Sequence, residues 1–219
     1  MTKSDVCKTG QTYVRPQLMN YEFLRYFLPV YFLLYFFVLV VLKAMVVGKQ
    51  IGKSPIVLTT DDSAFGLIGF YVKFAMLALV VYVIMFSVFP QWYRHFKPIM
   101  VLEHQRLKIA ALVLSLASLV WMVVSQNHMR QSWRLGVDLQ NKTELISDGV
   151  YKISRNPIYV GMLISIAALF IITTNMVTLL ISALTIVLVQ IQVRLGEEYL
   201  TKMHGQEFLN SKQKVRRWL

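Results

Sequence analysis

The sequence predicts an all-α protein, a polytopic transmembrane helical bundle of about five membrane helices. Of its 219 residues, 56% are hydrophobic and only 16% are charged, whereas about one quarter of a soluble domain is charged. The charged residues lie between long apolar runs, each close to the roughly 20 helical residues that cross the hydrocarbon core of a bilayer. The runs are continuous and lack the alternation of barrel strands. Because lipid offers no partner for backbone amides, they must be helices.

Five apolar runs define the elements of this bundle. They cover about residues 27–47, 65–89, 107–125, 158–173 and 176–193. Only Thr173, Thr174 and Asn175 separate the last two runs, and so short a connection requires an antiparallel helical hairpin. Because the fourth run is short, residue counting leaves open whether both arms cross the membrane fully. Residues 1–219 are expected to form one membrane domain, in which 1–125 is mainly scaffold and 126–219 carries the polar segments.

The basic charge of the chain fits a membrane protein. The formal net charge is +12, but Lys and Arg flank the apolar runs, as residues that face anionic lipid headgroups do. This arrangement excludes a nucleic-acid partner. It also favours a cytoplasmic C-terminus by a small margin, although the basic segment at residues 91–108 opposes that orientation. Cys7 is the sole cysteine, which excludes an intramolecular disulfide bond.

The first polar segment, residues 126–159, precedes the hairpin. It contains turn signals at Asp148-Gly149 and at Asn156-Pro157. Asn156 suits a helix N-cap and Pro157 suits the first helical position, so the fourth helix should begin there. The free amides of a helix N-terminus favour a carboxylate or phosphate. Taken alone, however, the pattern is more typical of a simple, well-capped helix start.

The second polar segment follows the fifth run. Arg194 lies three residues before Glu197 and four before Glu198, so it could pair with either. Alone, this is typical of an interfacial helix end with a solvated ion pair. The tight hairpin, however, returns both of its outer ends to one membrane face, where ionisable groups are costly unless they are paired or functional. We therefore expect one binding cleft there, built from Tyr151, Arg155, Asn156, Arg194, Glu197 and Glu198.

Residues 143–162, TELISDGVYKISRNPIYVGM, resemble the signature of the isoprenylcysteine carboxyl methyltransferase and phospholipid methyltransferase superfamily. The matching positions are Gly149, Tyr151, Arg155, Asn156, Pro157, Tyr159 and Gly161. The downstream pattern of the superfamily is matched by Arg194, Glu197, Glu198, Gly205, Phe208, Val215, Arg217 and Trp218. Ser132–Asp138 is also similar to many bacterial members. Two motifs in the right order around a helical hairpin make the resemblance specific.

The chain departs from the superfamily pattern at three points. The acidic pair lies one residue closer to Gly205 than usual, so Gly196 occupies the first acidic position, and Glu197 is a safer match than Glu198. Asn156 stands where the commonest version has His; it keeps hydrogen-bonding capacity but cannot act as a general base. Ser211 replaces the second tyrosine of the usual tail.

The resemblance implies an S-adenosylmethionine-dependent methyltransferase in the membrane, the bacterial inner membrane or an equivalent. Glu197, with Glu198 second, would hold the ribose or amino end of the cofactor, and Arg155 and Asn156 would hold its carboxylate or adenine edge. Gly149, Tyr151 and Tyr159 complete the implied cofactor site, although Tyr159 is equally typical of a core aromatic. Arg194 and Arg134 are assigned the catalytic role of orienting an anionic acceptor. No metal is implied.

The acceptor is expected to be a lipophilic or small carboxylate, thiol or amine that enters from the membrane. A carboxylate attacks as it stands, whereas an ammonium must first lose a proton to a base. His95, His104 and His128 are better explained as interfacial residues, which favours an acceptor that is already nucleophilic. Two alternatives stay open: an NADPH-dependent membrane reductase of the sterol reductase type, and a non-enzymatic small membrane protein. The sequence leaves the oligomeric state unspecified.

Overall fold

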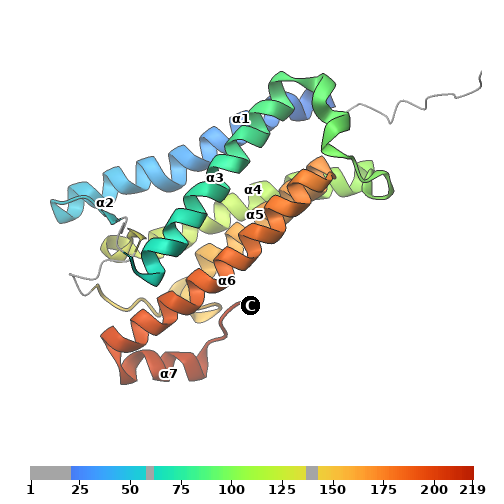
Figure 1. Ribbon diagram of the computed structural model, residues 1–219. Coiled ribbons are helices and arrows are strands. Elements are labelled where there is room, and N and C mark those ends of the chain that lie inside the picture. Colours follow the sequence, from blue (N-terminus) through green and yellow to red (C-terminus); the bar gives the residue numbers. More distant parts are fainter. Residues whose placement is uncertain (1–20, 58–61, 137–142) are drawn as a thin grey trace, which may run out of the picture.

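The computed structural model describes residues 21–57, 62–136 and 143–219. Cys7 and Asp138 therefore lie outside the described residues. Figure 1 shows a bundle of long helices that run roughly along one direction. The predicted all-α polytopic bundle is confirmed.

Among the residues that the structure describes, four helices are long and apolar enough to cross a membrane. The first, Tyr21–Ile51, has 31 residues and consists of α1 (Tyr21–Phe36), the π-helical segment η2 (Phe37–Leu42) and α2 (Lys43–Ile51). The others are α3 (Ala64–Val88), α4 (Gln105–His128) and α6 (Met176–His204). Each predicted run forms a helix, and the first helix extends beyond the predicted residues 27–47 at both ends.

Helix α5 (Pro157–Thr173) is the short arm of the hairpin, with 17 residues. At about 1.5 Å per residue it spans roughly 25 Å, less than the ~30 Å hydrocarbon core. When its far end is level with one membrane surface, its start at Pro157 is therefore recessed from the other surface. The residues around that start can then form a site at the membrane boundary.

Shorter elements connect these helices or, in the case of α7, follow the last of them. They are η3 (Pro90–Phe96), η4 (Met100–Leu102), η5 (Arg130–Ser132), η6 (Gly149–Lys152), α7 (Gln206–Lys214) and the strands β1 (Ile56–Val57) and β2 (Leu135–Gly136). The two strands pair in parallel, so the loop after α2 lies against the loop after α4. Figure 1 shows this pair at the end of the bundle where α5 and α3 begin and where α6 ends.

The hairpin between α5 and α6 turns at the predicted residues. Thr174 adopts the left-handed conformation, with φ of 41°, and Asn175 caps α6 by accepting a hydrogen bond from the Thr178 amide at 3.0 Å. The Asn175 side chain also donates to the Tyr82 hydroxyl of α3 at 2.8 Å. The cap thus satisfies a free helix amide and fixes the turn to a neighbouring helix. Figure 1 shows the two arms antiparallel.

Glu103 fixes the same turn from the loop before α4. Its carboxylate accepts hydrogen bonds from the Tyr93 hydroxyl at 2.8 Å, from Lys108 at 2.7 Å and from the Thr174 hydroxyl. The backbone amide of Ile99 also donates to the Thr174 carbonyl at 2.7 Å. The tip of the hairpin is therefore locked to the loops that follow α3, at the end of the bundle opposite to the start of α5.

Close packing of α4 against α5 forms the centre of the bundle. A Cβ atom on Gly161 would lie 2.3 Å from Cγ of Met122, so any larger residue at position 161 would clash with the Met122 side chain. The hydroxyls of Ser118 and Ser165 are 2.7 Å apart. Small residues of this kind let membrane helices approach closely. By contrast, the outer faces are apolar and exposed, as at Leu33, which is 72% exposed, and such a surface suits lipid contact.

Candidate active site

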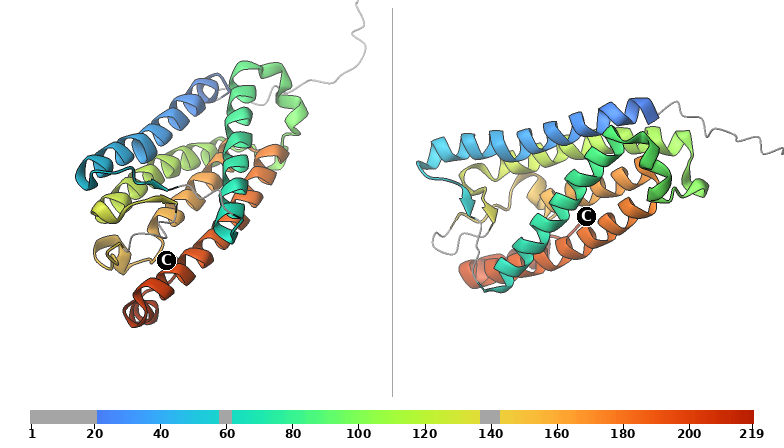
Figure 2. Two further views of the ribbon diagram at one scale, coloured as in Figure 1. Left: turned by 60° about the vertical axis from the view of Figure 1, so that its left-hand side comes forward. Right: turned by 45° about the horizontal axis from the view of Figure 1, so that its top comes forward.

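Glu197 is the centre of a polar cluster where α6 leaves the bundle and α5 begins. The residue is only 3% exposed. Figure 2 shows α7 folding back from the end of α6 beside this region. A buried carboxylate requires charged or hydrogen-bonding partners to offset its lost hydration, and Glu197 obtains them from two distant segments of the chain.

Both carboxylate oxygens of Glu197 are engaged. Oε1 accepts a hydrogen bond from Nδ2 of Asn156 and forms an ion pair with Nη2 of Arg155, each at 3.1 Å. Oε2 accepts two hydrogen bonds from Arg217, from Nη2 at 2.9 Å and from Nε at 3.1 Å. Two guanidinium groups therefore neutralise one buried carboxylate. The start of α5 and the end of α6 meet here, although 41 residues separate Asn156 from Glu197.

Asn156 occupies the expected N-cap position, and α5 begins at Pro157 as expected. The prediction that the Asn156 side chain caps α5 is wrong, however, because this side chain makes no hydrogen bond to its own helix. Its Nδ2 donates instead to the Glu197 carboxylate and, at 3.3 Å, to the Arg217 carbonyl. The buried carboxylate is a stronger acceptor than a neutral group, so Asn156 connects the helix start to the site.

The C-terminal tail completes the cluster. The Arg155 amide donates to the Arg216 carbonyl at 3.0 Å, and Nη1 of Arg155 donates to the Lys212 carbonyl at 3.1 Å. The Ser154 hydroxyl donates to the Arg217 carbonyl at 3.3 Å. Sequence reasoning noted Arg217 as part of the superfamily tail but gave it no place in the site. The match of Arg217 to that tail pattern was the sequence signal that could have placed it in the site.

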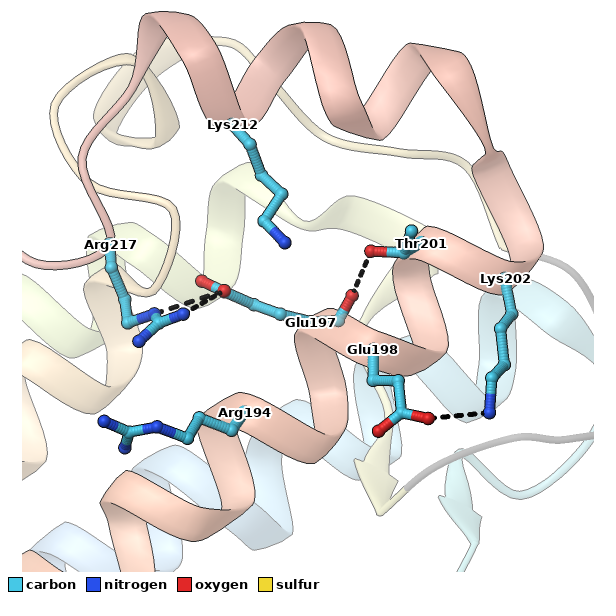
Figure 3. A pocket seen from close by; sticks show the side chains of 7 residues that line it. All are labelled: Arg194, Glu197, Glu198, Thr201, Lys202, Lys212 and Arg217. Atoms are coloured by element: carbon cyan, nitrogen blue, oxygen red, sulfur yellow. Dashed lines mark hydrogen bonds and ion pairs between the residues drawn. The ribbon is translucent and has the colours of Figure 1, made fainter.

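A pocket of about 300 Å³ opens beside this cluster. Figure 3 shows its lining residues: Arg194, Glu197, Glu198, Thr201, Lys202, Lys212 and Arg217. The volume is at the lower end of the usual range for ligand sites. The lining carries four cations and two carboxylates, and it is polar enough to bind a charged small molecule.

The two glutamates of this pocket differ in their surroundings. Glu197 is buried between arginines, whereas the side chain of Glu198 is 61% exposed and pairs with Lys202 at 2.8 Å. Arg194 and Lys212 are left as lining cations with no carboxylate partner among the described residues. The pocket therefore has a positive excess, which favours an anionic group of a ligand.

The expected ion pair of Arg194 with Glu197 or Glu198 is wrong. Nη1 of Arg194 instead donates to the carbonyl and to Oε1 of Gln190, each at 3.0 Å. Side chains on a helix tilt toward its N-terminus, so Arg194 reaches one turn back, while Arg155 and Arg217 hold Glu197. Arg194 still lines the pocket.

Six of the expected site residues do not line the pocket: Arg155 and Asn156, which contact its Glu197, and four that lie elsewhere. Arg134 lies before β2, and its Nη1 donates to the carbonyls of Gln131 and Trp133 at 2.6 and 2.9 Å. Tyr151 lies in η6, where burial raises the pKa of its hydroxyl. Gly149 has φ of +55°, and an added Cβ would lie 2.1 Å from the His128 ring. Tyr159 is half-buried in the first turn of α5.

Residues 105–207 match a family model described as phospholipid methyltransferase. The predicted superfamily is confirmed. No curated protein matches the chain. The phospholipid methyltransferase match runs from the first residue of α4 into α7, and it includes Arg155, Asn156 and Glu197 but ends before Arg217. The match indicates a membrane methyltransferase with a lipid-related acceptor. Among residues 21–57, 62–136 and 143–219, no group of three or more His, Cys, Asp or Glu side chains is arranged to hold a metal ion.

Proposed function

We propose that this chain transfers the methyl group of S-adenosylmethionine to a lipid-related acceptor that it meets at the membrane boundary. The observation that carries the proposal is the convergence of Arg155, Glu197 and Arg217 beside an open polar pocket, within a chain whose residues 105–207 match the phospholipid methyltransferase family. The bound cofactor would supply an electrophilic methyl group. The protein must hold donor and acceptor close, aligned and dry.

The residues of the pocket fit such a cofactor. Lys212, a lining cation without a carboxylate partner in the described part of the chain, suits its carboxylate. Glu198 and the Thr201 hydroxyl suit its amino or hydroxyl groups. Nε of Arg155 is buried and has no hydrogen-bond partner among the described residues. A buried donor without an acceptor is costly, and a ligand atom would relieve that cost.

Glu197 acts in this proposal mainly as a positioning residue. Three hydrogen bonds and one ion pair already use its two oxygens, and a carboxylate has about four acceptor sites. A ribose hydroxyl would therefore reach Glu197 only by replacing Arg217 or Asn156. Its more direct effect is to hold Arg217 in the lining of the pocket and Arg155 directly behind it.

The composition of the pocket favours an acceptor that is already nucleophilic. None of its lining residues is a histidine, and His128 instead packs against Gly149 with its Nδ1 2.9 Å from the Val124 carbonyl. An ammonium acceptor would have to lose its proton to a carboxylate of the lining, which is a weaker base than histidine, whereas a carboxylate or thiolate acceptor needs no base. We propose Arg194 as the residue that orients such an anionic acceptor.

Binding of the cofactor to the purified protein tests the proposal. The full chain in detergent is titrated by calorimetry with S-adenosylmethionine and, in parallel, with NADPH. We expect saturable binding of S-adenosylmethionine and none of NADPH. Binding of NADPH alone would identify a reductase, and intact helices with no binding of either at millimolar concentration would identify a non-enzymatic membrane protein.

A further inference from the structure

Lys43 is a cation buried inside the membrane bundle. It is the first residue of α2, within the apolar helix Tyr21–Ile51, and only 9% of it is exposed. Leu39 and Val47, one turn before and after it, are buried on the same helical face. Lys43 therefore projects into the contact between the first membrane helix and α4 instead of into lipid.

Among the described residues, no carboxylate pairs with the Lys43 ammonium, whereas other buried cations have such a partner. Arg155 meets Glu197 at 3.1 Å and Lys108 meets Glu103 at 2.7 Å. Nζ of Lys43 donates instead to Oδ1 of Asn127 at 3.3 Å, and the described residues place no carboxylate within 4.0 Å of it. One neutral acceptor satisfies one of three ammonium donors, and the C-terminal end of α4 adds only a partial negative charge. An uncompensated charge at this depth is costly and often functional.

The backbone next to Lys43 is also unusual. Residues Phe37–Leu42 form a π-helix that ends directly before it, and π-helical turns occur frequently at functional sites. The side chain of Gln126 donates to the Leu39 carbonyl of this segment at 2.9 Å. The last two turns of α4 therefore contribute both Gln126, which braces the π-helix, and Asn127, which holds Lys43.

Lys43 lies toward the end of the bundle that carries the candidate active site. Its partner Asn127 is in the last turn of α4, and His128, the next residue, packs against Gly149 of η6. Figure 1 shows the ends of α4 and α2 at the same end of the bundle as the start of α5. A lipid headgroup that packs at this end of the bundle would supply an anionic partner for Lys43.

We infer that Lys43, with Asn127, binds the phosphate of a phospholipid headgroup. The ammonium supplies the charge and two unused donors, and the Asn127 amide nitrogen supplies a further donor beside it. The braced π-helix keeps Lys43 in place before the lipid arrives. The inference does not depend on methyl transfer, since a bound lipid at this position can be a substrate or a permanent component of the fold.

Lipid binding by matched lysine variants tests the inference. The wild-type chain, Lys43→Met and Lys49→Met are purified in detergent, delipidated and titrated with phosphatidylglycerol or with diacylglycerol, which has no phosphate, and bound lipid is counted by native mass spectrometry. Lys49 is exposed on the same helix and is the control. We expect Lys43→Met to weaken phosphatidylglycerol binding by at least about tenfold, Lys49→Met to leave it unchanged, and Lys43→Arg to restore most of it.

Further measurements distinguish a specific loss of lipid binding from a loss of folding and from a site that binds free anions. Methionine has a similar length and no charge, and such replacements of buried charges are often neutral or stabilising, so the melting temperature without lipid should not fall. Equal phosphatidylglycerol binding by Lys43→Met and wild type would overturn the inference. Displacement of the lipid by inorganic phosphate at equal concentration would show a free-anion site instead. A parallel titration with S-adenosylmethionine keeps this outcome distinct from that of the proposed function.

Discussion

The side-chain amide of Asn156 lies 3.1 Å from Oε1 of Glu197, so the residue that precedes α5 is bonded to the end of α6 and not to its own helix. This bond and the adjacent Arg155–Glu197 ion pair join the two outer ends of the hairpin. The C-terminal tail adds Arg217 to the same carboxylate. A single buried residue thus organises three segments of the chain, and the following predictions test what each contact does.

Replacing Glu197 by Gln should weaken binding of S-adenosylmethionine. The neutral amide keeps the shape of the side chain but loses the charge that positions Arg155 and Arg217. We expect a loss of about 1–3 kcal/mol, which is roughly 5- to 150-fold in Kd, measured by calorimetry in detergent. Glu207→Gln is the matched control, because the side chain of Glu207 is 70% exposed and does not line the pocket. Equal affinities of Glu197→Gln and wild type would remove Glu197 from the site.

Replacing Arg217 by Gln should destabilise the protein more than the same change at Arg216. Arg217 donates two hydrogen bonds to Glu197, whereas Arg216 is exposed and offers its backbone carbonyl to Arg155. Because the Arg217 side chain is 33% exposed, solvent reduces the cost below that of a fully buried pair, to about 1–2 kcal/mol. Melting temperatures of both variants in one detergent measure the difference. Similar melting temperatures would show that the tail contact contributes little.

The stability of the hairpin tip should depend on pH through Glu103. Burial alone would raise the pKa of Glu103, but hydrogen bonds from Lys108, Thr174 and Tyr93 hold the pKa below its ordinary value of 4.5. A carboxylate with a lowered folded-state pKa stabilises the fold above its unfolded pKa. That contribution is lost as the pH falls below 4.5 through the folded value.

The Glu103→Gln variant separates this contribution from general acid unfolding. It should melt at a lower temperature than wild type at neutral pH, and its melting temperature should change less when the pH is lowered. Glu22→Gln is the control, since the side chain of Glu22 is 72% exposed and lies 3.9 Å from Arg25. If Glu103→Gln and wild type lose stability in parallel on acidification, Glu103 is not the titrating group.

Alanine at Gly149 and at Gly196 should have opposite effects. Gly149 has a positive φ and contacts the His128 ring, so Gly149→Ala should cost about 1–3 kcal/mol through backbone strain alone. Gly196 lies within α6 with nothing within 4 Å of an added Cβ, so Gly196→Ala should stabilise the helix by up to about 1 kcal/mol. Melting temperatures measure both. Destabilisation by Gly196→Ala would indicate that the superfamily's first acidic position must stay open.

The membrane helices and the hairpin could be predicted because they depend on local features of the chain. Long apolar runs must be helical in lipid. Only three polar residues, Thr173, Thr174 and Asn175, lie between two such runs, so the chain must reverse direction there. The start of α5 at Pro157 follows from its fixed backbone angle and missing amide proton. The hairpin then brings residues far apart in sequence to one end of the bundle.

The partners of each polar side chain depend on the tertiary structure, because they are chosen among residues distant in sequence. Spacing along α6 favours pairs of Arg194 with Glu197 or Glu198, yet Arg155 and Arg217 bind Glu197 and Arg194 turns to Gln190. Capping rules place Asn156 correctly but not its side chain, which the buried carboxylate attracts. The sequence by itself therefore determines which segments meet. The tertiary structure decides which atoms bond, because the buried carboxylate of Glu197 must be paired with the donors that the packed fold brings closest to it.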